Sequence, residues 1–135
     1  MGFTLDQYAA LRPFLYHITA RENLERLRRT RRLETASVLL RAGGREDLLR
    51  ARRPGSLTIT LGSDSIVIKD QRPLVLANLQ FPTGWRIDDF VGYLNDHVYF
   101  WPGDASGLIG PGDRFLAHYA SEEPLVVRFR FRALI

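Results

Sequence analysis

A histidine and a threonine stand where an apolar stretch gives way to a polar one, in FLYHITAREN at residues 14–23. A histidine at a strand end can donate a hydrogen bond to a sugar hydroxyl or a carbonyl while the backbone fixes its other ring nitrogen. Thr19 adds a hydroxyl beside an expected helix N-terminus, where anions are stabilised. His17 and Thr19 are therefore candidate ligand-binding residues. The alternative is a packed core histidine followed by an ordinary helix cap.

A second polar cluster, KDQRPL at residues 69–74, follows an apolar segment. The guanidinium of Arg72 can bind a phosphate or carboxylate through two hydrogen bonds, and the amide of Gln71 can recognise another amide. Both residues are candidates for a binding site. A polar surface turn with an Asp–Arg ion pair is the alternative interpretation.

Three consecutive aromatic residues, Tyr99, Phe100 and Trp101, occur in LNDHVYFWPG. Neighbouring side chains on a strand point to opposite faces of the sheet. One face would then pack into the core, and the other could stack a flat ring such as a nicotinamide or a base. Tyr99 and Phe100 are the candidates for stacking. The alternative is that all of these rings pack in the core or at a sheet edge.

Composition narrows the classes of protein that fit this chain of 135 residues. The length suits one domain, 1–135. The absence of cysteine excludes disulfides and thiolate chemistry, and the three histidines lack short-range ligand spacing, so no metal site is expected. No apolar run reaches the roughly 18 residues of a membrane span, and no secretory signal is recognisable, so we expect a cytoplasmic protein without a membrane partner.

The positive charge of the chain is carried by arginine and concentrated in its first half. Eighteen arginines accompany a single lysine, Lys69. Residues 1–68 hold 12 arginines and 7 acidic residues (+5), whereas residues 69–135 hold 7 basic and 8 acidic residues (−1). A positive face of this kind can neutralise phosphates, which makes a nucleic acid a possible partner. The alternative is a solvated helix face.

Hydrophobic periodicity and capping signals predict short helices and short strands. "TARE" has the form of a capping box, with Thr19 as N-cap of a helix that ends near Arg31, and Asp113 is expected to cap a later helix. Pro73 is expected to open a helix from Leu74 to about Leu79. Helices are further predicted at 5–11, within 33–44, within 45–55, within 86–96 and within 113–120; strands are predicted at 14–18, 56–62, 65–69, 97–101 and 124–134. The fold class is α+β, with mostly antiparallel strands and peripheral helices.

Taken together, these motifs resemble a known group of proteins. "LYHIT" followed by "ENL", then "IVIKDQRPL", then "DDFVGYLNDHVYFWPG" is similar to a bacterial family with a histidine-containing strand near the N-terminus, an "RDQRPL"-like segment and an "LNxxVFFW"-like strand. That family in turn resembles the DarT-type DNA ADP-ribosyltransferases, in which a "YHIT" or "YHMT" strand and a following "NL" open the domain. The resemblance covers roughly residues 14–29 and 66–103.

The resemblance implies an ADP-ribosyltransferase-like domain that uses NAD and is of the toxin kind. His17 would contact the ribose on the nicotinamide side, with Thr19 beside it, and Tyr99 or Phe100 would stack on the nicotinamide. Arg72, helped by Gln71, would serve the phosphates or the acceptor. The reaction would cleave the bond at the nicotinamide-bearing C1′ and transfer ADP-ribose to a nucleic acid or a protein.

The resemblance also implies a catalytic glutamate on a late strand, where a carboxylate stabilises an oxocarbenium-like state. Here Glu122 and Glu123 are the candidates, although they precede the last strand, whose polar positions carry arginine. The family continues past the position of Ile135, which suggests a form shortened at its C-terminus. Two other hypotheses stay open. One is a catalytically inactive nucleotide- or nucleic-acid-binding module on the same fold, and the other is an interaction domain that pairs through its last strand.

Overall fold

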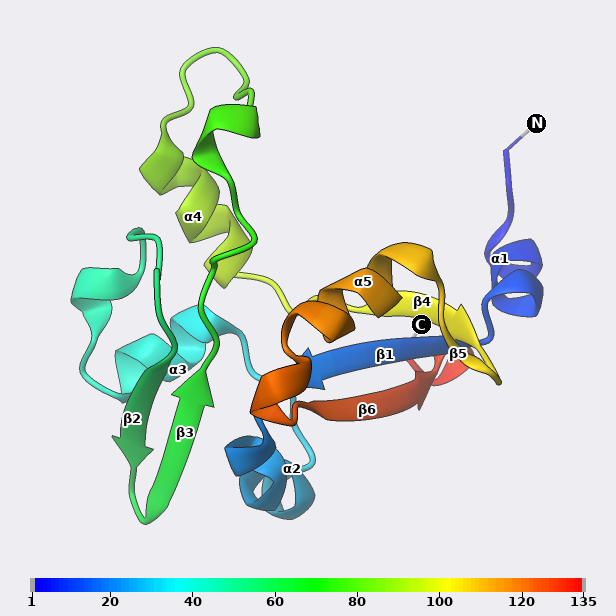
Figure 1. Ribbon diagram of the computed structural model, residues 1–135, viewed down its shortest axis with the longest axis horizontal. Coiled ribbons are helices and arrows are strands. Elements are labelled where there is room, and N and C mark those ends of the chain that lie inside the picture. The colour runs from blue at the N-terminus through cyan, green and yellow to red at the C-terminus, as the bar shows by residue number, and fades with distance from the viewer. Residues whose placement is uncertain (1, 135) are drawn as a thin grey trace. The chain divides into compact units, whose positions relative to one another are not determined.

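The computed structural model describes residues 2–134, apart from the side chain of Leu76. The chain forms two compact units (Figure 1). The terminal unit contains the segments up to Arg21 and from Tyr99 onward, and the central unit runs from Glu22 to Val98. Within the described residues, no helix has both the length and the apolarity to cross a membrane.

The terminal unit is built on a four-stranded sheet in the order β5-β4-β1-β6, with antiparallel pairing throughout. Its strands are β1 (Phe14–Thr19), β4 (Trp101–Asp104), β5 (Gly107–Leu108) and β6 (Leu125–Arg130). Two helices, α1 (Leu5–Leu11) and α5 (Gly110–His118), and the 3-10 turns η4 (Ala120–Glu122) and η5 (Phe131–Ala133) complete it. Strand β1 lies in the middle and β6 at an edge, the position that pairing with a partner would require.

Close backbone approach fixes the pairing of β4 with its neighbours. A Cβ atom at Gly103 would lie 2.2 Å from the carbonyl oxygen of Gly107 and 2.6 Å from the ring of Tyr16, so only glycine fits there. The buried Tyr16 hydroxyl donates a 2.5 Å hydrogen bond to the carbonyl of Asp104. Helix α5 packs against β4, where the Trp101 and Phe115 rings lie 5.1 Å apart.

The central unit joins a two-stranded antiparallel sheet to short helices. Its strands are β2 (Leu57–Leu61) and β3 (Asp64–Ile68), and its helices are α2 (Leu24–Thr30), α3 (Ala36–Ala42) and α4 (Ile87–Asn95). Three 3-10 turns are η1 (Arg21–Asn23), which leads into α2, η2 (Glu46–Leu48) and η3 (Leu76–Asn78). The hairpin turns its isoleucines to the inside, and Leu40 of α3 packs against them. The buried core consists of Leu40, Ile59, Ile66 and Ile68.

A side-chain amide of the central unit also holds the edge of this sheet. Asn23, in η1, donates from Nδ2 to the carbonyl of Val67, and its Oδ1 accepts from the Val67 N–H, both at 2.8 Å. The amide of Asn23 therefore takes the place of a neighbouring strand at this point of β3.

The α+β class and the antiparallel pairing are confirmed, together with most predicted elements. Strand β1 extends through Thr19, which pairs with Leu125, and the 3-10 turn η1 separates Thr19 from α2, so α2 begins later than expected, directly after Asn23. Capping by the Thr19 side chain stays a prediction. The expected cap at Asp113 is wrong. Helix α5 starts at Gly110, since Pro111 is already compatible with its first turn.

Two further boundaries differ from the sequence-based expectation. The predicted strand at 97–101 is wrong in its position, because pairing with β1 starts at Trp101 opposite Tyr16 and continues through Pro102 and Gly103. The helix expected from Leu74 to about Leu79 is only the 3-10 turn η3. These errors share a physical cause. Each boundary is fixed by long-range strand pairing or by local turn geometry that propensity does not specify.

Candidate functional site

Strand register brings three distant segments to one end of the sheet in the terminal unit. Strand β6 runs antiparallel to β1, with Leu125 opposite Thr19, so the residues just before β6 lie where β1 ends. Strand β4 begins opposite Tyr16, so the residues just before β4 lie at the same end (Figure 1). Six of the eight predicted site residues belong to these segments: His17, Thr19, Tyr99, Phe100, Glu122 and Glu123.

His17 is held in one orientation by the backbone. Its Nδ1 lies 2.9 Å from the carbonyl oxygen of Tyr99, and a carbonyl only accepts, so Nδ1 carries the proton of this bond. Burial lowers the pKa of His17, opposed by the hydrogen bond to Tyr99, which favours a neutral ring near pH 7. Nε2, which bonds to no other described residue, then has a lone pair. The prediction that the backbone fixes one ring nitrogen is confirmed, but the other nitrogen accepts rather than donates.

The two candidate stacking residues differ in their surroundings. The Phe100 ring lies 5.9 Å from His17 and 5.7 Å from Phe129, in edge or tilted contacts typical of packing. Tyr99 retains 47% of its accessible surface. Phe100 therefore supports the His17 ring, and Tyr99 offers the larger accessible aromatic surface at this end of the sheet.

The glutamates lie on the turn that enters β6. Glu122 ends η4, and Glu123 follows it with a left-handed backbone (φ 49°). The carboxylate of Glu123 pairs with Arg21, and both side chains are largely exposed. Exposed pairs of this kind contribute little to stability, so a ligand can displace this one at small cost. As expected from the sequence, neither glutamate lies on β6.

Gln71 and Arg72 lie in the central unit, where Gln71 forms hydrogen bonds and Arg72 forms an ion pair with neighbouring residues. The side-chain oxygen of Gln71 accepts from the Arg53 N–H at 2.9 Å, and the Gln71 N–H donates to the Arg53 carbonyl at 2.7 Å. Arg72 Nε lies 3.0 Å from Asp70 Oδ2, in a carboxylate that is 1% exposed. Roles for Arg72 and Gln71 towards NAD phosphates or an acceptor stay a prediction.

A buried polar network connects the KDQR segment to helix α4. Arg53 donates from Nη1 to Asn95 Oδ1 at 2.8 Å and from Nε to the carbonyl of Lys69 at 2.9 Å. Asn95 Nδ2 in turn donates to the carbonyl of Leu49 at 2.9 Å. Burial lowers the pKa of Arg53, partly offset by Asp70. The sequence-based search missed this network, although Asn95 follows the fully buried Val91 at the i,i+4 spacing of a core position.

Many arginines of the first half are neutralised within the central unit. Arg26 bonds to Glu34 and Asp64, and Arg29 also bonds to Asp64, which lowers the pKa of Asp64. Arg31 and Arg32 are exposed and form no ion pair with any other described residue. The surface available for phosphate is therefore smaller than the charge count suggests, and a nucleic-acid partner stays a prediction.

Metal chemistry finds no support in the geometry of the described residues. Between residues 2 and 134, no three histidine, aspartate or glutamate side chains are grouped so that they could hold a metal ion.

Comparison with known proteins assigns the chain to a family. Residues 13–135 match the model of DUF7002, a family of unknown function. The chain matches no curated protein and no solved structure. The match includes β1, β4 and β6 with all six residues gathered at the sheet end. Because it covers nearly the whole chain, the protein is a member of the DUF7002 family.

Proposed function

We propose that this protein is an NAD-dependent ADP-ribosyltransferase-like enzyme of the cytoplasm, with the fold of that class, which transfers ADP-ribose to a nucleic acid or a protein. One observation carries the proposal. Strand register gathers His17, Thr19, Tyr99, Phe100 and the two glutamates at one end of the sheet, although the first and last of their three segments are more than 100 positions apart. The motif resemblance had assigned NAD or catalytic roles to these same residues.

The proposed chemistry follows from the groups at the sheet end. The neutral His17 accepts a hydrogen bond at Nε2 from a ribose hydroxyl, and Tyr99 stacks on the nicotinamide. The C1′–N bond breaks and its electron pair leaves with neutral nicotinamide. A carboxylate of Glu122 or Glu123 stabilises the positive charge that develops on the sugar. An acceptor atom then bonds to C1′ and releases its proton to water.

A non-catalytic nucleotide-binding module is the second candidate. The observation in its favour is that Glu123 is paired with Arg21 and that both glutamates precede β6. In this case His17 and Tyr99 bind the nucleotide in the same way, and no carboxylate acts on the sugar.

Thermal unfolding with and without millimolar NAD tests binding, and release of nicotinamide tests turnover. One-site binding predicts about 2.7 kcal/mol of stabilisation at a hundredfold excess over the dissociation constant. His17→Ala should abolish the shift. The matched control is His118→Ala, which removes an exposed histidine from α5 in the same unit and should leave the shift intact.

The outcomes separate the two candidates. An NAD-dependent shift with nicotinamide release that falls in Glu122→Gln or Glu123→Gln supports the enzyme. A shift without release supports the binding module. No shift in the wild type, or equal losses in His17→Ala and His118→Ala, would refute both proposals.

A further inference from the structure

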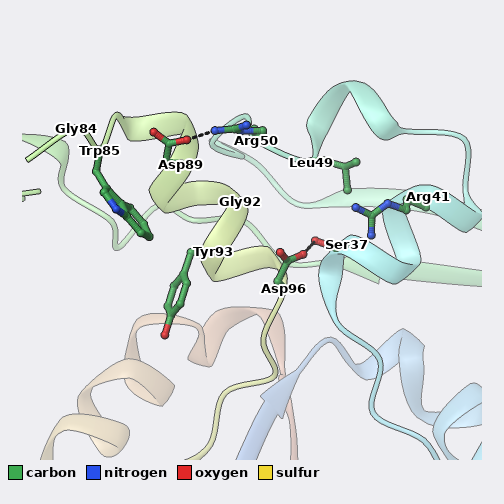
Figure 2. A pocket seen from close by; sticks show the side chains of 10 residues that line it. All are labelled: Ser37, Arg41, Leu49, Arg50, Gly84, Trp85, Asp89, Gly92, Tyr93 and Asp96. Atoms are coloured by element: carbon green, nitrogen blue, oxygen red, sulfur yellow. Dashed lines mark hydrogen bonds and ion pairs between the residues drawn. The ribbon is translucent and has the colours of Figure 1, made fainter. Parts of the chain in front are cut away.

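A pocket of about 610 Å³ lies within the central unit, between α3 and α4 (Figure 2). Pockets that bind small molecules have volumes of roughly 300–1,000 Å³. All of its lining residues lie between Ser37 and Asp96, so the pocket is independent of the sheet end in the terminal unit. Its lining includes Asp89, Gly92, Tyr93 and Asp96 of the DDFVGYLNDHVYFWPG motif, but the roles assigned to that motif lie at Tyr99 and Phe100 and do not account for the pocket.

One side of the pocket is aromatic. Trp85 and Tyr93 retain 42% and 51% of their accessible surface, and their rings meet edge to face with centroids 6.1 Å apart. The centroid of the His97 ring lies 4.4 Å from that of the Tyr93 ring, and this contact helps to hold the Tyr93 ring. Two large rings kept accessible at one pocket are suited to packing on a flat or apolar ligand group.

The other side of the pocket carries two exposed side chains of opposite charge, Arg41 and Asp96. The side chain of Arg41 forms no ion pair or hydrogen bond with the described residues, and Arg41 lies one helical turn after Ser37 on α3. The buried Ser37 donates a 2.5 Å hydrogen bond to Asp96 Oδ1, which leaves Oδ2 of this carboxylate open. The remaining charges, Arg50 and Asp89, neutralise each other (Figure 2).

This arrangement matches a ligand that carries both charges. The two arginines and two aspartates of the pocket sum to zero, and because Arg50 and Asp89 are paired, a phosphate dianion would meet one unpaired carboxylate for one unpaired guanidinium. A single carboxylate suits the planar fork of Arg41, and an ammonium group suits Asp96. Ser37 bonds to Asp96 and lies one helical turn before Arg41, a spacing that suits a ligand whose two charged groups are close together, as they are in an α-amino acid.

We propose that the pocket between α3 and α4 binds a free aromatic α-amino acid. Its carboxylate bonds to Arg41, its ammonium group bonds to Asp96, and its ring packs on Trp85 and Tyr93. This site is separate from the NAD site proposed above and does not depend on it.

Calorimetric titration of the full chain with phenylalanine tests the proposal. Two analogues separate the contributions of the charges: 3-phenylpropionate lacks the ammonium group, and phenethylamine lacks the carboxylate. Loss of one charge-assisted contact should weaken binding about tenfold or more. The same loss is expected for phenylalanine with Arg41→Gln, and with Asp96→Asn, which keeps the acceptor for Ser37.

Two further variants guard against indirect effects. Arg32→Gln removes an exposed, unpaired arginine outside the pocket and should bind phenylalanine like the wild type. Gly92→Leu fills the pocket from α4, where an added Cβ meets only the Arg50 side chain at 3.5 Å, and should abolish binding without unfolding the unit. Absence of phenylalanine binding to the folded wild type, equal losses in Arg41→Gln and Arg32→Gln, or tighter binding of adenosine monophosphate would overturn the proposal.

Discussion

Removing the Asn95 side chain should strongly destabilise the central unit. Asn95 is 1% exposed, and its amide bridges the Arg53 guanidinium and the carbonyl of Leu49. Asn95→Ala removes a hydrogen bond to a charged group, typically about 1.5–3 kcal/mol, and leaves a partly buried carbonyl unpaired, typically about 1–3 kcal/mol. We expect a loss of about 3 kcal/mol, a large share of the 5–15 kcal/mol that stabilises a typical domain.

Native-state hydrogen exchange is the suitable assay, because it reports the opening free energy of each unit separately. The amides of β2 and β3 should exchange faster in Asn95→Ala, and those of β1 serve as a reference in the terminal unit. The matched control is Asn78→Ala, an exposed asparagine of η3. If Asn95→Ala costs no more than Asn78→Ala, the network does not stabilise the unit and the reasoning fails.

Three further predictions concern single side chains. Gly103→Ala should lower the melting temperature, by an overpacking cost of about 1–3 kcal/mol, whereas Gly55→Ala, with nothing within 4 Å of the added Cβ, should not. Asn23→Ala should cost about 2 kcal/mol and accelerate exchange of the Val67 amide, which loses its acceptor. Folding lowers the pKa of His17, so the stability that the neutral histidine contributes is present above its unfolded pKa of about 6.5. This stability is lost as the pH falls through the pKa of His17 in the folded protein, so acid should destabilise the wild type.

Each of these predictions has a result that would contradict it. Equal melting temperatures for Gly103→Ala and Gly55→Ala would mean that β4 and β5 can move apart to accommodate the added methyl group without a loss of stability. An unchanged exchange rate of the Val67 amide in Asn23→Ala would show that another group accepts the hydrogen bond of this N–H. Acid unfolding curves that coincide for the wild type and His17→Gln would show that the histidine is not desolvated in the folded chain.

Local sequence determined much of the secondary structure. The alternation of apolar and polar residues located β2 and β3, and the 3.6-residue periodicity located α1 and α4. Signals of this kind arise from residues that are close together in the sequence, so they can be recognised without the tertiary structure. Where the boundary depends on a partner strand, as at Trp101, the same signals were wrong.

Candidate site residues could be chosen from the sequence by chemical type, but their grouping could not. The types of His17 and Tyr99 marked them as candidates, whereas the register of β1 against β4 and β6 decided that they lie together. Arg53 and Arg41 both look like surface charges in the sequence. The tertiary structure buries the first beside Asn95 and leaves the second unpaired at a pocket, because burial and partner distance depend on segments far apart in the chain.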